Sequence, residues 1–266
     1  MNKKRTIFYF DGFNLHHGML KNTPQRWLDL EKFANALLPR PDEHEIIRIN
    51  YFTARIKYDP SRPKEAFNQD RYLEALTAYP LVRVVEGYYK RFKVKLPFAK
   101  EPCKSCDKAS YGIVWKTEEK RSDVNLATEM IADVYRDAAD TFVLVSGDAD
   151  LAAPLCFIRH IARKQTLVFN PHDMVCEELR KYTSYIKIIP RNLLSQCELP
   201  DEVRAPHRII RRPPEWCRPS LPNMATMTDD EIDAEIQHGL YSVKAGNYRP
   251  VSEARAEFEE EHIMPK

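Results

Sequence analysis

Short apolar runs alternate along the first 190 residues with stretches in which apolar residues recur every three or four positions. The first pattern is typical of buried β-strands and the second of helices that cover a sheet. The apolar runs predict strands at residues 6–10, 45–53, 81–86, 141–146, 165–169 and 185–189. The helical spacing predicts helices at residues 27–38, 63–79, 122–137, 151–163 and 174–182. Such alternation predicts an α/β fold with a doubly wound, mostly parallel sheet flanked by helices.

Two stretches depart from this alternation. Residues 87–119 interrupt it, mix basic with aromatic side chains and contain a C-x-x-C pair, so we interpret them as an insertion. Beyond residue 190 prolines accumulate, and prolines disfavour helices. We therefore predict a domain at residues 1–190 and a Pro-rich arm from residue 191 to 266 that includes a short acidic helix at residues 228–238.

Composition and charge narrow the class of protein. With 266 residues, 43% of them hydrophobic, the chain can form one sizeable globular domain and an appendage. The net charge of +2 is close to balance, so affinity for nucleic acid would have to come from a local patch. No stretch reaches the roughly 18 apolar residues of a membrane span. The first apolar run breaks at Asp11, unlike a signal peptide, and the six cysteines are scattered except for one pair. We expect a cytoplasmic protein that has no membrane contact.

Four aspartates stand at the ends of predicted elements. Asp11 ends the first strand, Asp148 and Asp150 follow the fourth strand, and Asp123 begins the helix after the insertion. The first and fourth strands of a doubly wound sheet are commonly neighbours, and ligands bind where they end. We therefore expect these carboxylates to converge. Since like charges repel, a divalent cation that prefers oxygen ligands, Mg²⁺ or Mn²⁺, would be needed there.

Such ions activate water and stabilise a leaving oxygen in phosphodiester hydrolysis. Asn14 is expected to orient Asp11 or a metal-bound water, and Ser146 to act similarly. His16 and His17 follow closely, either as a general base or as polar residues at the edge of the cleft. No P-loop and no G-x-G-x-x-G motif is present, so the sequence does not predict a nucleotide or dinucleotide site.

Three motifs occur in order over roughly residues 5–190: FYFDGFNLHHGM, EKRSDVNLATEMIADVY and FVLVSGDADLAAPL. Together they resemble the NYN domain family, PIN-like proteins related to the LabA/DUF88 group. The resemblance implies a PIN-like α/β fold and a metal-dependent ribonuclease activity. It implies that the family's acidic positions, its asparagine and the lysine before its helix fall here on Asp11, Asp123, Asp148, Asp150, Asn14 and Lys120.

The insertion adds two further expectations. Basic residues interleaved with aromatic ones suit a single strand of nucleic acid, because cations follow phosphates and rings stack on bases. The candidate substrate-binding residues are Lys90, Arg91, Phe92, Lys93 and Lys120. An exposed β-hairpin with basic residues that protect its edge explains the same pattern. Cys103 and Cys106 are half of a zinc site, which would need distant ligands or a partner chain, or else a pair of free thiols.

The sequence thus predicts a metal-dependent ribonuclease that acts on single-stranded RNA. One alternative is a metal-dependent, hydroxylase- or monooxygenase-like enzyme that acts on a small aromatic molecule, with aromatic side chains of the insertion as the pocket wall. The other is a non-catalytic RNA-binding module. An open, basic-rimmed groove would favour nucleic acid, and a closed aromatic cavity would favour the small molecule. Association with a second copy of the chain stays open.

Overall fold

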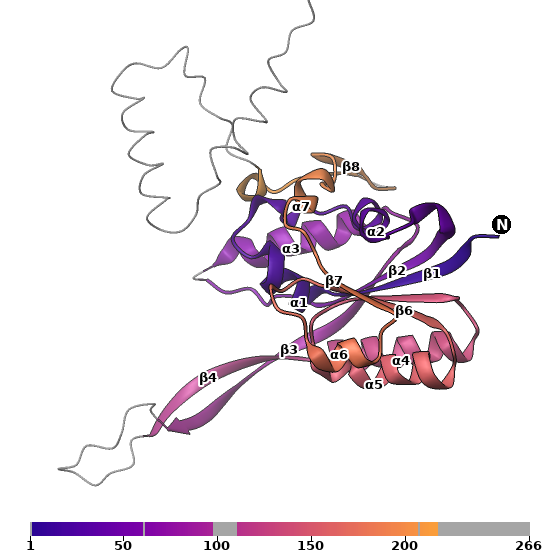
Figure 1. Cartoon of the computed structure of the whole chain (residues 1–266). Helices are drawn as coiled ribbons and strands as arrows, with labels where there is room; N and C mark the ends of the chain where they lie inside the picture. Colours follow the sequence, from indigo (N-terminus) through magenta and orange to yellow (C-terminus); the bar gives the residue numbers. More distant parts are fainter. Residues whose placement is uncertain (1, 61, 98–110, 207, 218–266) are drawn as a thin grey trace, which may run out of the picture. The chain divides into compact units, whose positions relative to one another are not determined.

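The computed structural model describes residues 2–60, 62–97, 111–206 and 208–217. Within them seven strands form one sheet in the order β4-β3-β2-β1-β5-β6-β7 (Figure 1). The strands are β1 (Lys4–Asp11), β2 (His44–Ala54), β3 (Val82–Pro97), β4 (Tyr111–Lys120), β5 (Thr141–Val145), β6 (Gln165–Asn170) and β7 (Tyr185–Ile188). All neighbouring pairs are parallel except β3 and β4. The strand order reverses at β1, which pairs with both β2 and β5, as the sequence predicts.

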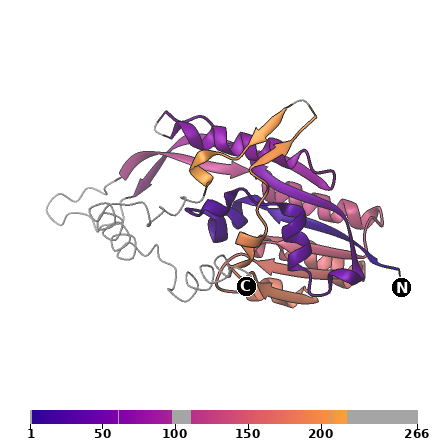
Figure 2. The ribbon, with the colours of Figure 1, turned by 90° about the horizontal axis from the view of Figure 1, so that it is seen from above.

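Helices cover both faces of the sheet (Figures 1 and 2). One face carries α2 (Leu30–Leu37), α3 (Pro63–Leu76) and α7 (Leu193–Gln196), and the other carries α4 (Ser122–Tyr135), α5 (Ala152–Cys156) and α6 (Glu177–Lys181). The short α1 (Gly12–Leu15) follows β1 directly. In the part of the chain that the structure describes, no helix is long and apolar enough to cross a membrane.

The strand β1 shows why its sequence is apolar at every position. Phe8 and Phe10 are fully buried in the core under α2 and α3, whereas Ile7 and Tyr9 are buried in the core under α4 and α5. A parallel strand covered on both faces needs apolar side chains in both directions. Tyr9 meets the polar requirement of its hydroxyl by donating a hydrogen bond of 2.7 Å to the buried Asp133 of α4.

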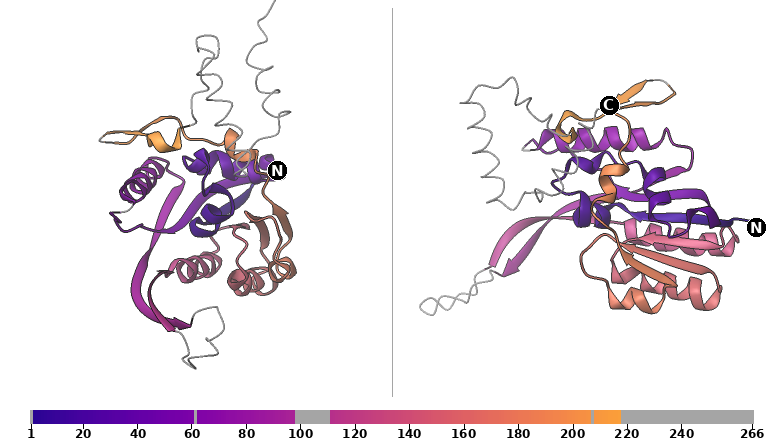
Figure 3. Two further views of the ribbon diagram at one scale, coloured as in Figure 1. Left: turned by 90° about the vertical axis from the view of Figure 1, so that its left-hand side faces the viewer. Right: turned by 45° about the horizontal axis from the view of Figure 1, so that its top comes forward.

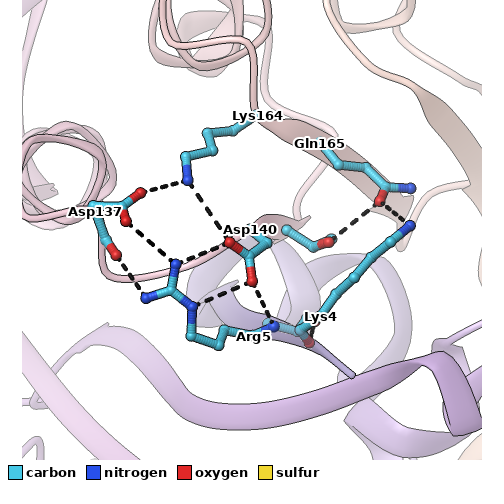
Figure 4. A network of polar contacts seen from close by, with 8 residues as sticks. Lys4, Arg5, Asp137, Asp140, Lys164 and Gln165 are labelled. Atoms are coloured by element: carbon cyan, nitrogen blue, oxygen red, sulfur yellow. Dashed lines mark hydrogen bonds and ion pairs between the residues drawn. The ribbon is translucent and has the colours of Figure 1, made fainter. Parts of the chain in front are cut away.

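A polar network ties the amino ends of the strands together (Figure 4). Arg5 of β1 donates to both carboxylate oxygens of Asp140, at 2.9 and 3.2 Å, and to the backbone oxygen of Asp137 at 2.8 Å. Lys164 pairs with Asp137 at 2.5 Å. Because these groups are partly exposed to solvent, each pair adds little stability. The network joins the start of β1 to the turns before β5 and β6, at the end of the sheet opposite Asp11.

Some predicted boundaries change for local reasons. The helix predicted at residues 27–38 begins only at Leu30, because Asp29 caps it by accepting hydrogen bonds from the Glu31 and Lys32 amides at 3.0 Å each. The helix predicted at residues 151–163 is a run of three shorter turns between Ala149 and Ile161.

The insertion predicted at residues 87–119 is in large part a β-hairpin. The strand predicted at residues 81–86 continues to Pro97 as β3, and β4 returns antiparallel to it. Continuous cross-strand pairing explains why the helical rhythm breaks here. Cys103 and Cys106 lie outside the described residues, so the zinc site and the thiol pair both remain predictions.

The compact unit extends to Cys217, beyond the boundary predicted at residue 190. Its last part holds α7, β8 (Glu202–Arg204) and β9 (Ile209–Arg211). Prolines prevent a long helix there, but they do not prevent packing. Trp216 lies against Trp27 and Tyr72, with ring centroids 6.4 and 6.2 Å apart. The acidic helix predicted at residues 228–238 lies outside the described residues.

We expect Trp216→Ala to lower the free energy of unfolding by about 3–5 kcal/mol, because it removes a large buried ring from the core. Trp216 is 7% exposed. Tyr135→Ala is the matched control: that ring is 92% exposed, and its loss should change stability by less than about 0.5 kcal/mol. Urea unfolding measures both. Equal midpoints for Trp216→Ala and the native chain would mean that residues 191–217 do not stabilise the domain.

Candidate metal centre

Three of the four predicted aspartates meet at the carboxyl end of the sheet. Asp11, Asp123 and Asp148 each offer a carboxylate oxygen, and these atoms all lie within 4.8 Å of one another. Asp11 is the last residue of β1, Asp148 follows β5, and Asp123 lies in the first turn of α4. The parallel pairing of β1 with β5 brings the first two together. Asp150 is exposed and is not part of this group.

Ser146 links the two acid-bearing strands. Its hydroxyl is fully buried, donates to Asp11 Oδ2 at 2.9 Å and accepts from the Asp148 amide at 3.1 Å. Asp148 Oδ1 in turn accepts from the Asp150 amide at 3.0 Å. One serine therefore fixes the position of one carboxylate and of the backbone that carries the second.

Asn14 acts on the same loop through two different groups. Its backbone N–H donates to Asp11 Oδ1 at 2.9 Å, and its side-chain Oδ1 accepts from the backbone N–H of Gly147 at 2.9 Å. Gly147 is needed there, because a Cβ at that position would lie 2.4 Å from Asn170 Oδ1. The side chain of Asn14 thus holds the loop after β5, while its backbone orients Asp11.

The electrostatics of the group favour a bound cation. Burial raises the pKa of Asp11 to about 6, and the charges of Asp123 and Glu119 add to this, against the hydrogen bonds from Asn14 and Ser146. Burial also raises the pKa of Asp123, as do the nearby charges of Asp148 and Asp150. Carboxylates that are disfavoured as free anions and that point oxygens at a common space fit a divalent metal ion.

Glu119, an acid that the sequence did not single out, belongs to the same surroundings. It lies on β4 opposite Tyr89. Its Oε1 accepts a hydrogen bond from Ser122, and its Oε2 is buried without a hydrogen-bond partner among the described residues. Burial raises its pKa, and the charge of Asp123 adds to the effect. In the hairpin, the alternation of side chains along the two strands puts Tyr89 and Glu119 on the same side. The sequence shows this alternation, but it does not show which residues of the two strands pair.

The two histidines after Asp11 lie next to each other, with ring centroids 5.3 Å apart. Burial lowers the pKa of His16 to about 4, and the charges of His17, Arg26 and Lys21 add to this. His16 is therefore neutral at physiological pH. His17 is exposed and packs on Phe13, with centroids 4.3 Å apart. A role for either as general base stays a prediction.

The candidate substrate-binding residues lie on the hairpin, which extends away from the body of the sheet (Figures 1 and 3). Lys90, Arg91, Phe92 and Lys93 follow one another on β3, and Lys120 ends β4 beside Glu119. Of the five, only Lys120 comes next in sequence to a residue of the acidic surroundings.

Residues 5–189 match the family model described as "NYN domain". The chain belongs to the NYN domain family. The family is generally one of nucleases that bind RNA, so its fold is nuclease-like, and in this NYN domain the acidic cluster of Asp11, Asp123 and Asp148 can bind a metal ion.

A curated relative of this NYN domain is named 6-hydroxy-3-succinoylpyridine 3-monooxygenase HspA, from Pseudomonas putida. It is 36% identical over 173 residues, which cover 58% of this chain and 55% of the relative. The chain thus spans about half the length of that relative. A solved structure of a protein of unknown function from Vibrio parahaemolyticus is 16% identical, with a TM-score of 0.44, over 71% of this chain and 94% of that one. A likeness at that level adds nothing to the fold described above.

We expect Ser146→Ala to weaken binding of Mn²⁺ by about 10–100-fold, the usual effect of removing a residue that orients a metal ligand. The variant leaves Asp11 Oδ2 buried without its donor. Titration calorimetry measures the affinity. Ser195→Ala is the control, since this residue is exposed and its hydroxyl donates to the Asn192 backbone oxygen at 2.9 Å. Unchanged affinity in Ser146→Ala would show that Asp11 does not depend on this contact.

Proposed function

We propose that this NYN domain is a metal-dependent ribonuclease whose Mg²⁺ or Mn²⁺ is held by Asp11, Asp123 and Asp148. The observation that carries the proposal is the grouping of three carboxylate oxygens within 4.8 Å at the carboxyl end of the sheet. Oxygen ligands of this kind suit both ions. A bound ion would activate a water and stabilise the leaving oxygen of a phosphodiester.

The remaining residues of the site have positioning roles in this proposal. Ser146 holds Asp11 and the backbone of Asp148 in one arrangement, and Asn14 fixes Gly147. Asp150 is exposed beside Asp148, so we assign it to waters around the ion rather than to the ion itself. Mg²⁺ commonly keeps several waters, which gives an outer carboxylate such a role.

Single-stranded RNA is the proposed substrate, and the hairpin is its proposed contact. Lys90, Arg91 and Lys93 are exposed there, and Phe92 is half-buried among them. Lys120 is exposed at the base of the hairpin, next to the acids. Cations and aromatic rings in this mixture bind phosphates and bases without sequence preference.

A second candidate function is supported by the relative named as a monooxygenase, which is 36% identical. In that case the same carboxylates would hold iron or manganese, and the substrate would be a small aromatic molecule. Such an enzyme needs an electron donor, and the sequence contains no dinucleotide-binding motif to supply one. For this reason we place it second, and a non-catalytic RNA-binding role third.

The test is cleavage of an end-labelled single-stranded RNA by the full chain, with Mg²⁺, with Mn²⁺ or with a chelator. We expect cleavage with either metal and none with the chelator. Cleavage in the presence of the chelator would indicate a contaminating nuclease. If neither metal supports cleavage, the ribonuclease proposal is wrong, and analysis of the metal that copurifies with the chain then tests for iron.

A further inference from the structure

The hairpin has two chemically different faces, because successive residues of a strand point to opposite sides. The first, here called the Trp115 face, carries Arg91, Lys93 and Lys95 from β3 together with Tyr111 and Trp115 from β4. The cross-strand pairs Lys93–Trp115 and Pro97–Tyr111 put these residues on one side. Arg91 and Lys93 both lie over the Trp115 ring, and Lys95 lies over the Tyr111 ring, which agrees with that assignment.

The second, here called the Phe92 face, carries Lys90, Phe92, Lys116, Glu118 and Lys120. Most of its cations form ion pairs with a carboxylate of the same face. Glu118 pairs with Lys116 at 2.5 Å and with Lys120 at 2.7 Å. These two ammonium groups hold the pKa of Glu118 down at about 2. Two of the three cations on this face therefore already have a carboxylate partner.

All three cations of the Trp115 face lie over aromatic rings, whereas of the three on the Phe92 face only Lys90 does, 6.0 Å from the centre of the Phe92 ring. The Arg91 guanidinium and the Lys93 ammonium lie 4.9 and 5.2 Å from the centre of the Trp115 ring, and the Lys95 ammonium lies 5.0 Å from that of Tyr111. No carboxylate among the described residues pairs with any of these three cations. Both rings are more than half exposed, at 57% for Trp115 and 52% for Tyr111.

The same face leads to the metal centre. Going toward the sheet, the next cross-strand pair on this side beyond Arg91 is Tyr89 with Glu119. Glu119 lies close enough to Asp11 and Asp123 for its charge to interact with both. A ligand that follows the Trp115 face inward therefore reaches Glu119 and, beside it, the acids.

We propose that a single strand of nucleic acid lies along the Trp115 face, with phosphates on Arg91, Lys93 and Lys95 and bases stacked on Trp115 and Tyr111. The inference rests on the proposed ribonuclease function for the direction in which the strand runs, from the hairpin to the acids. It adds Lys95, Tyr111 and Trp115 to the contact residues, and it moves the contact away from Lys90 and Phe92. Complementary charge and exposed rings on one continuous side are what such a strand requires.

Protection of a sheet edge would explain basic residues on both faces equally. The Phe92 side of the hairpin also has two contacts between a cation and a ring, Lys90 over the half-buried Phe92 and Arg121 over Tyr88. Edge protection does not explain why three cations without a carboxylate partner among the described residues gather on the Trp115 face over two rings that are both more than half exposed. If the strand binds the Trp115 face, removing cations there should weaken binding, whereas removing a cation from the Phe92 face should not.

The first experiment measures binding of a fluorescent 20-nucleotide uridine RNA by anisotropy over a range of salt concentrations, with a chelator present so that no metal-dependent cleavage occurs. We expect Lys93→Gln with Lys95→Gln to weaken binding at least tenfold. The slope of log affinity against log salt should fall by about 1.4, because two phosphate contacts are lost. Lys116→Gln with Lys181→Gln removes the same charge outside the face and should change affinity less than about twofold. Equal losses in both variants, or no binding by the native chain, would overturn the proposal.

The second experiment uses tryptophan fluorescence. The chain has three tryptophans, of which Trp27 and Trp216 are buried and Trp115 is exposed. Stacking of a base on Trp115 should quench the exposed fraction of the emission as RNA is added, and Trp115→Leu should abolish this quenching. Saturating binding without quenching would place the strand elsewhere.

The two proposals fail separately. Binding with these signatures in a protein that cuts no RNA under any metal would overturn the ribonuclease and leave the binding face. Metal-dependent cleavage that the Lys93→Gln with Lys95→Gln variant leaves unchanged would overturn the binding face and leave the ribonuclease.

Discussion

Asp148→Asn is expected to lower metal-dependent RNA cleavage by about 100-fold or more while the fold stays intact. The change removes a negative oxygen ligand from a group of three, and the metal ion supplies the water activation. Asparagine keeps a side-chain oxygen that can accept the hydrogen bond which Asp148 Oδ1 receives from the Asp150 amide. The local turn should therefore form as before. The measurement is kcat/KM for the labelled RNA, together with Mn²⁺ affinity and the melting temperature.

Asp150→Asn is the matched control, since it makes the same chemical change two residues away on an exposed side chain outside the group. It should lower kcat/KM by less than about tenfold, as expected for a carboxylate that acts through water. If Asp148→Asn cleaves RNA at the native rate, Asp148 is not a metal ligand. A larger loss in Asp150→Asn than in Asp148→Asn would exchange their roles.

Asp11→Asn is expected to stabilise the metal-free protein at neutral pH and to abolish its stabilisation by Mn²⁺. Burial raises the pKa of Asp11 from 3.8 to about 6, so the folded chain holds this proton more tightly than the unfolded chain. The contribution of Asp11 to stability is therefore fully present below about pH 4 and is lost as the pH rises through 6. A shift of this size corresponds to roughly 3 kcal/mol of unfolding free energy between pH 4 and pH 7.

The check is urea unfolding of the native chain and of Asp11→Asn at several pH values in a chelator. The difference between the two proteins should grow in favour of the variant from pH 4 to pH 7, because asparagine carries no charge to bury. Adding Mn²⁺ at pH 7 should then stabilise the native chain and leave the variant unchanged, since binding to the folded state alone raises its stability. Parallel pH profiles would mean that the Asp11 carboxylate is not a buried charge.

The NYN match covers residues 5–189 and includes the acids, whereas the monooxygenase-named relative matches over about half of its own length. The geometry adds an acidic group beside a basic and aromatic hairpin face. An acidic group of this kind beside exposed cations and rings favours RNA as the proposed substrate.

The sequence by itself determined the fold class, the adjacency of the first and fourth predicted strands, and the three acids that the structure groups together. Apolar runs that are buried on both faces, such as β1, and helices with one apolar side leave few arrangements other than a doubly wound sheet. In that sheet the first and fourth regular strands end side by side, so Asp11 and Asp148 follow from the pattern alone. The motif that carries Asp123 added the third residue.

Only the tertiary structure decided what lies around those residues. The sequence allows a β-hairpin in residues 87–119 but does not give its cross-strand register, and it is this register that identifies Glu119 and the Trp115 face. Prolines disfavour a helix, but they do not prevent a segment from packing on the core. The contact of the buried Trp216 with Trp27 therefore could not be predicted from the sequence. In each case the deciding contacts join residues far apart in the chain, and local periodicity carries no information about them.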